Sequence, residues 1–144
     1  MGVKLIYRNK TKVEERISVT EKWQAYDALK AHWDMDEIEL REECKALFLD
    51  HKCRVMSYSS ISKGGFAATY VDLRYVFTIA LKRRASSIIL AHNHPSGNLR
   101  PSQSDLQLTR DFIEAGKILR LPVVDHLIIT KDGFSSVLDF LPEQ

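Results

Sequence analysis

The stretch SSIILAHNHP, residues 86–95, decides how this chain folds. After two serines it contains the short apolar run Ile88 to Ala91, with two β-branched isoleucines, which predicts a buried strand over Ser86 to Ala91. Pro95 cannot donate a hydrogen bond within a central strand, so the strand ends in the polar residues before it. A strand buried on both faces needs other elements packed against it, so helices are expected on the two faces of its sheet.

Amphipathic segments flank this strand in the sequence. Asp72 is a favourable N-cap for a helix whose apolar residues recur at helical spacing. Ser102, with Asp105 three residues later, marks the start of a second helix. The expected core stripes are Leu73, Val76, Phe77, Ala80 and Leu81 in the first helix, and Leu108, Phe112, Ala115 and Leu119 in the second.

The remaining elements follow from the same rules. Ser18 and Glu21 have capping-box spacing, which predicts a helix over about residues 21–33. Further strands are expected at Cys44–Leu49, Cys53–Ile61, Val123–Ile129 and Phe134–Leu138, and an edge hairpin at Val3–Tyr7 and Val13–Val19. The order ββαββαβαββ predicts an α/β fold with a mixed β-sheet and packed helices. We assign residues 1–20 to an N-terminal hairpin extension and residues 21–144 to the domain itself.

Composition indicates an ordinary globular domain. The chain has 144 residues, of which 44% are hydrophobic and 28% charged, enough for one core and too few for a second domain of usual size. The net charge of +2 is too small for a protein that coats a polyanion. The basic run Lys82–Arg84 is more typical of a helix end than of a nucleic-acid interface.

Other sequence features suggest a location and a redox state. Cys44 and Cys53 lie in or beside apolar runs and are expected to be reduced and packed. The N-terminus lacks the pattern of a signal peptide, and the longest apolar run, Ile88 to Ala91, is far shorter than the ~20 residues that cross a bilayer. We therefore expect a cytoplasmic protein without a membrane partner.

The residues that follow the buried strand indicate a metal site. His92 and His94 are separated by one residue in an extended segment, so both imidazoles point to one side and Asn93 points away. Asp105 lies in the first turn of the next helix, and the Gly- and Pro-containing loop between can return its carboxylate to the strand end. Two imidazoles and one carboxylate are typical of catalytic zinc, which keeps a fourth position for water, although iron oxygenases use the same ligand types. Such a site favours hydrolysis near neutral pH.

The whole string resembles a known superfamily. His92, His94, Ser102 and Asp105 fit the HxH-x7-S-x2-D signature of the JAMM (MPN+) metalloproteases. HNHPSG, PSxxD, Thr109 and the segment Val124–Ile129 more specifically resemble the RadC family, over roughly residues 24–140.

The resemblance implies a cytidine-deaminase-like JAMM/MPN fold, with one zinc ion bound by His92, His94 and Asp105. It also implies a glutamate as general acid and base on the strand after the first helix. The family pattern places this glutamate two residues before a hydrophobic or cysteine position, so Glu42 is our choice and Glu43 the fallback. Strand alternation lets only one of them face the site. Ser102 is expected to cap its helix and, as the superfamily implies, to donate a hydrogen bond to the tetrahedral intermediate.

These expectations lead to a zinc metallopeptidase or isopeptidase acting on a peptide or protein substrate. The alternatives are a DNA-repair-associated accessory module with a non-catalytic metal site, and a metal-dependent nuclease. The roughly 40 residues before Glu42 contain no hairpin motif of the kind used on DNA, so strong DNA affinity is not expected. His126 is either a partner of a metal ligand or a structural residue of its strand, and we favour the structural role. His32 and His51 are expected at the surface.

Overall fold

The computed structural model describes residues 2–4, 12–64 and 70–142 of the chain. Over these residues a five-stranded sheet is combined with three α-helices and two short 3-10 turns. The elements in chain order are η1 (Val13–Glu15), α1 (Lys22–Lys30), β1 (Glu43–Leu49), β2 (Val55–Lys63), α2 (Leu73–Lys82), β3 (Ser87–Asn93), α3 (Gln103–Leu119), β4 (Val123–Ile129), β5 (Phe134–Ser136) and η2 (Val137–Phe140).

The sheet is mixed, as the sequence predicts. Its strand order is β2-β1-β3-β4-β5. β3 and β4 pair in parallel, whereas the other neighbours are antiparallel. β1 and β3 consist entirely of buried residues, which suits their central places because helices cover both of their faces.

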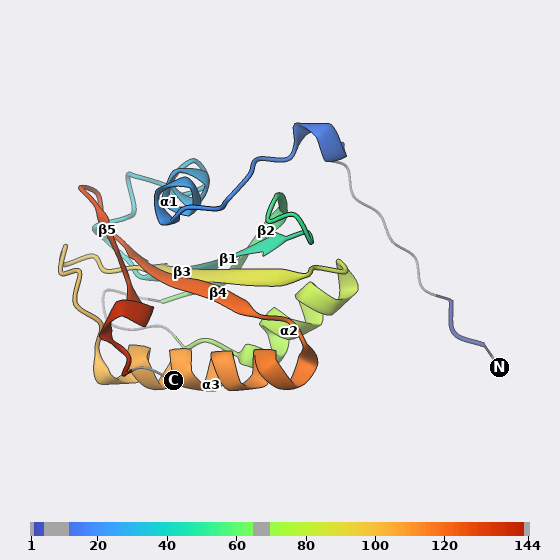
Figure 1. Ribbon diagram of the computed structural model, residues 1–144. Helices are drawn as coiled ribbons and strands as arrows, with labels where there is room; N and C mark the ends of the chain where they lie inside the picture. Colours follow the sequence, from blue (N-terminus) through green and yellow to red (C-terminus); the bar gives the residue numbers. More distant parts are fainter. Residues whose placement is uncertain (1, 5–11, 65–69, 143–144) are drawn as a thin grey trace.

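Figure 1 shows the sheet between two helical layers, with α1 on one face and α2 and α3 on the other. Side chains of β1 alternate between the two cores: Leu47 packs in the cluster that includes Leu29 of α1, whereas Phe48 packs in the cluster of α2 and α3. In the second core Phe77 and Phe112 meet edge to face, with ring centroids 5.2 Å apart. The α/β fold class is confirmed.

The N-terminal expectations need correction. The predicted strand over 13–19 is wrong, because Val13–Glu15 forms a 3-10 turn and only Ser18 makes a single bridge, to Arg54. Val13 and Ile17 remain exposed, so no apolar face holds this segment in a strand. The other half of the expected hairpin, Val3–Tyr7, lies mostly outside the described residues.

The first helix begins at Lys22, close to the predicted start at about residue 21, but its cap differs from the predicted one. Its capping box is formed by Glu21 and Gln24, not by Ser18 and Glu21, since Ser18 is engaged in the bridge to Arg54. The helix ends at Lys30, and Trp33 follows in a turn that still packs against the α1 core.

Two residues assigned to core stripes lie outside the core. Leu81 and Leu119 are 55% and 43% exposed, because both occur in the last turn of their helices, beyond the reach of the sheet. The last predicted strand is also shorter, since residues after Ser136 turn into η2. Among the described residues, helices fall short of the length and apolar character that a bilayer crossing requires.

Candidate metal centre

The candidate centre lies where β3 ends and β1 begins. Because the two strands are antiparallel, these ends are adjacent, and Cys44 pairs with His92. Glu42 is two residues from Cys44, and His94 is two residues from His92, so alternation brings all of them to one face of the sheet. α3 covers that face, and its first turn carries Asp105.

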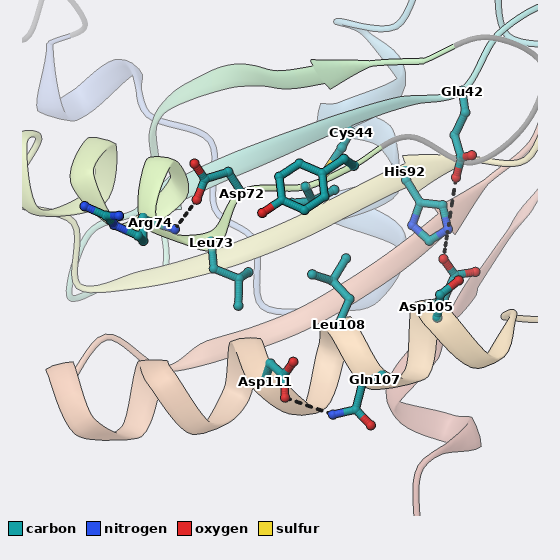
Figure 2. A pocket seen from close by; sticks show the side chains of 13 residues that line it. Glu42, Cys44, Asp72, Leu73, Arg74, His92, Asp105, Gln107, Leu108 and Asp111 are labelled. Atoms are coloured by element: carbon teal, nitrogen blue, oxygen red, sulfur yellow. Dashed lines mark hydrogen bonds and ion pairs between the residues drawn. The ribbon is translucent and has the colours of Figure 1, made fainter.

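Four side chains meet at this point, and their ligand atoms all lie within 4.8 Å of one another: Glu42, His92, His94 and Asp105. The Nε2 atom of His92 lies 2.9 Å from Nε2 of His94 and 3.3 Å from Oδ1 of Asp105. Oδ2 of Asp105 lies 3.1 Å from Nε2 of His94. Oε1 of Glu42 approaches Nε2 of His92 at 3.8 Å. Figure 2 shows Glu42 and Asp105 reaching His92 from different elements.

The neighbouring residues Asn93 and Glu43 point to the opposite face, as alternation predicts. The side chain of Asn93 accepts from the backbone N–H of Glu43 and donates to the carbonyls of Ile38 and Arg41. Glu43 accepts a hydrogen bond from Ser60 at 2.6 Å. Of the two candidate glutamates, the structure therefore places Glu42 at the cluster and Glu43 away from it.

The start of α3 orients Asp105. The hydroxyl oxygen of Ser102 accepts from the backbone N–H of Asp105 at 3.0 Å, and Oδ2 of Asp105 accepts from the backbone N–H of Ser102 at 2.9 Å. This capping box confirms Ser102 as the N-cap. It also aims the other carboxylate oxygen of Asp105 at His92.

The charges of the cluster suit a cation. Burial raises the pKa of Asp105, but the imidazoles of His92 and His94 beside its carboxylate outweigh that effect and hold this pKa well below its ordinary value. Burial lowers the pKa of His94, but the contacts with Asp105 and with the Asn98 carbonyl prevail and raise it. A metal ion binds the deprotonated forms and displaces such a proton. Imidazole nitrogens together with carboxylate oxygens form a donor set that zinc takes, so the residues fit this metal.

The ring of His94 is held by the loop that follows it. Its Nδ1 lies 2.7 Å from the backbone carbonyl oxygen of Asn98. A carbonyl only accepts hydrogen bonds, so Nδ1 is the donor and Nε2 is directed to the cluster.

Two further residues, His126 and Thr109, support the cluster. The sequence favours a structural role for His126 over contact with a metal ligand, and it indicates no role for Thr109 at the site. His126 of β4 is fully buried, with Nε2 lying 2.8 Å from Nδ1 of His92. Burial, and then the neighbouring His92, hold the pKa of His126 well below its ordinary value, which keeps this ring neutral. Thr109 of α3 is also fully buried, with its hydroxyl 2.6 Å from Nδ1 of His126. The available signal was spacing, since Thr109 lies four residues after Asp105 and shares its helix face.

Two cavities open onto the cluster, and Glu42 and Asp105 line both. The larger, of about 530 Å³, extends between α2 and α3 and has Leu73 and Leu108 among its apolar walls (Figure 2). The smaller, of about 340 Å³, is bordered by the loop after β3 and by Ser102.

The other histidines and the basic run considered in the sequence analysis lie outside the cluster. His32 and His51 are exposed, as expected, and the ring of His32 stacks on that of Tyr58 with centroids 3.7 Å apart. Within the basic run, Arg83 donates to the hydroxyl of Ser57 at 2.9 Å and to the carbonyl of Tyr58 at 3.1 Å. Arg83 thus fastens the end of α2 to β2.

Comparisons of the sequence with known proteins identify the family of the chain. The sequence model of the family described as "RadC-like JAB domain" matches residues 19–140. The chain belongs to the RadC family. A Flavobacterium johnsoniae relative named "UPF0758 protein" is 48% identical over 98 residues, which cover 68% of this chain and 43% of that protein. "UPF0758 protein pc1765" of Protochlamydia amoebophila is 39% identical over 127 residues, covering 88% of this chain and 54% of the relative.

The RadC-family chain therefore spans about half the length of the curated relatives it matches. Its mixed sheet with three helices is consistent with the JAB/MPN fold expected from the sequence. The family match includes all four residues of the cluster, which lie between Glu42 and Asp105. This RadC-like domain thus carries a Glu, His, His and Asp group, two members buried and two partly buried, that can hold a metal ion.

Proposed function

We propose that this RadC-family domain is a zinc-dependent hydrolase of peptide or isopeptide bonds, with His92, His94 and Asp105 as the metal ligands. The observation that carries the proposal is the position of Glu42. Its carboxylate stands 3.8 Å from His92, whereas Asp105 approaches the two imidazoles to 3.1 and 3.3 Å. A carboxylate slightly withdrawn from three ligands is placed to handle a proton beside the metal rather than to complete its coordination.

The chain's own residues divide the chemistry among them. A divalent cation supplies Lewis acidity, which lowers the pKa of a water molecule and polarises a carbonyl group. Glu42 takes a proton from the attacking water and returns it to the leaving amine. The hydroxyl oxygen of Ser102 accepts from the Asp105 N–H and lies 3.1 Å from the hydroxyl oxygen of Ser104. With Ser104 donating in that contact, the Ser102 hydrogen donates to the carbonyl oxygen as that oxygen gains charge.

The two cavities support an extended substrate. Both meet at Glu42 and Asp105, and they lead away along different elements, one between α2 and α3 and the other beside the loop after β3. A chain that continues on both sides of the cleaved bond would occupy the two together. This favours a peptide or protein substrate over a small molecule.

The test compares the adjacent glutamates on an unbiased peptide library with the zinc-loaded protein. Glu42→Gln should keep the fold and the zinc content and should lower the hydrolytic rate by ~10²–10⁴, the range for a lost general acid and base. Glu43→Gln is the matched control, because Glu43 faces Ser60 on the other side of the sheet, and it should change the rate little.

Two outcomes would contradict the proposal. Equal losses from both substitutions would mean that Glu42 has no special part in the chemistry. Cleavage of DNA in place of peptides, lost in Glu42→Gln, would replace the peptidase with a nuclease that uses the same centre.

A further inference from the structure

We infer that Thr109 and His126 form a positioning pair that fixes the tautomer of His92, so that the ring nitrogen facing the cluster keeps its lone pair for a metal ion. The inference rests on the proposed metal site and concerns two residues outside its ligand set. Thr109 belongs to α3, His126 to β4 and His92 to β3, and all three side chains are buried.

Three short contacts join these residues into one chain. The hydroxyl of Thr109 donates to the backbone carbonyl of Asp105 at 2.7 Å. The same oxygen lies 2.6 Å from Nδ1 of His126. The other nitrogen of His126, Nε2, lies 2.8 Å from Nδ1 of His92. The chain therefore runs from the backbone of one proposed ligand to the ring of another.

The direction of each hydrogen bond follows from the first one. A hydroxyl has a single hydrogen, and Thr109 gives it to a carbonyl that can only accept. Nδ1 of His126 must then donate to Thr109, which leaves Nε2 of this neutral ring as an acceptor. Nδ1 of His92 must donate to that acceptor, so the proton of a neutral His92 lies on Nδ1 and the lone pair on Nε2.

The opposite direction is unfavourable. If Thr109 donated to His126, its oxygen and the Asp105 carbonyl oxygen would stand 2.7 Å apart without a hydrogen between them. His126 would then donate from Nε2, and His92 would carry its proton on the nitrogen that faces Asp105 and His94. A proton there competes with a metal ion for the same position.

The Thr109 hydroxyl also links two ligand-bearing elements. It contacts the backbone carbonyl of Asp105 in α3, and it also contacts His126, whose ring contacts His92 of β3. His94 obtains the same tautomer from the Asn98 carbonyl in its own loop. The two imidazoles are thus oriented by independent partners, as is usual for metal-binding histidines.

Thr109→Val tests the pair, since valine keeps the shape of threonine and removes the hydroxyl. Without that acceptor, the His126 N–H would face a methyl group, so we expect His126 to move its proton to Nε2 and His92 to move its proton to Nε2 in turn. Thr109→Ser should restore the original state. Thr78→Val is the matched control, because Thr78 also donates to the carbonyl four residues earlier, that of Arg74, but lies on the exposed face of α2.

Two measurements read the result. Nitrogen-15 NMR of the metal-free protein at about pH 8, above the ordinary histidine pKa, reports which ring nitrogen carries the proton. It should show Nδ1–H for His92 and His126 in wild type, Thr109→Ser and Thr78→Val, and Nε2–H for both in Thr109→Val. Competition with a chelator should show zinc affinity about 10–100-fold weaker in Thr109→Val alone.

Wild-type protein with the His92 proton on Nε2 would overturn the inference, and so would Thr109→Val with unchanged tautomers and unchanged zinc affinity. A wild type that has the expected tautomers but binds no zinc would support the pair and contradict the proposed metal site. Loss of zinc affinity in Thr109→Ser equal to that in Thr109→Val would also count against the pair, because serine retains the hydroxyl.

Discussion

Strand β1 is flanked by two buried carboxylates, Glu42 just before it and Asp50 just after it, and they have different surroundings. Asp50 accepts from the backbone N–H groups of Lys52 and Arg54 at 2.9 and 3.0 Å. The guanidinium groups of Arg16 and Arg54 lie 3.0 and 2.9 Å from its other oxygen. Burial raises the pKa of Asp50, but these donors outweigh that effect and lower it to about 2.

Glu42 instead lies in a cluster with a second carboxylate, Asp105, and two imidazoles. At the Asp50 end the chain supplies arginine cations close to the buried negative charge. At the Glu42 end the two carboxylates and the imidazoles form a set that a divalent cation can complete. One buried acid is thus neutralised by cations of the chain itself, whereas the other belongs to a group that can hold a metal ion.

The largest expected effect is the loss of the ion at the Glu42 end. We expect about one equivalent of zinc in wild type, because two imidazoles and a carboxylate form a three-ligand site. His92→Ala and Asp105→Ala should each abolish this occupancy, as measured by elemental analysis after dialysis. His32→Ala is the control and should retain zinc, because the exposed His32 stacks on Tyr58 and is not a member of the cluster. Wild type without zinc after incubation with the metal would refute the distinction between the two ends.

The next effect concerns stability at the Asp50 end. Asp50→Ala leaves two arginines without their carboxylate, and Arg16 is nearly buried, so the free energy of unfolding should fall by about 3 kcal/mol. Urea denaturation measures the change. Asp139→Ala breaks the exposed ion pair with Lys22 and should cost less than about 1 kcal/mol. Zinc content should be the same in both variants; loss of zinc in Asp50→Ala would mean that the two ends are coupled.

The contribution of Asp50 to stability should also depend on pH. The pKa of Asp50 is lower in the folded chain, so its contribution is complete above the unfolded pKa of about 4 and disappears as the pH falls toward about 2. Over this window wild type should lose more stability than Asp50→Ala. Denaturation midpoints at several acidic pH values give the comparison, and parallel curves for the two proteins would contradict it.

The smallest expected effect is a difference in the reactivity of the two cysteine thiols. Cys44, at the Glu42 end, is fully buried, and burial followed by the charge of Glu42 raises the pKa of its thiol. Cys53, near the Asp50 end, is half-buried in the hairpin turn. A thiol reagent should therefore modify Cys53 in the native protein and Cys44 only after unfolding, because the thiolate is the reactive form. Mass spectrometry of the labelled peptides measures the modification of each cysteine. Equal labelling of Cys44 and Cys53 in the native protein would contradict the prediction.

Much of the site was predictable because its geometry is local. The separation of His92 and His94 fixes their common face, and the capping spacing of Ser102 and Asp105 fixes the start of α3. The choice of Glu42 over Glu43 came from the family pattern, and strand alternation predicted that only one of the two could face the site. Local rules of this kind succeed where residues within one element decide the outcome.

The less predictable parts depend on contacts between distant segments. The contact of His126 with His92 requires β4 to lie beside β3 in parallel, which no short pattern specifies. The segment after Val13 has strand-like composition but finds only one bridge, at Ser18, so it does not become a strand. The burial of a residue in the last turn of a helix, such as Leu119, depends on whether the sheet extends beneath it. The periodic pattern of apolar residues in the sequence does not show where the sheet ends, and Leu119 is exposed.

The pairing of β1 with β3, and of β3 with β4, has a consequence for the rates of folding and unfolding. The cluster and its supporting pair come from four elements spread over the chain, so they assemble only after strands distant in sequence have paired. An ion that binds this assembly stabilises the native state and finds few of its ligands together earlier. We therefore expect zinc to slow the unfolding of this domain while leaving the speed of its folding nearly unchanged.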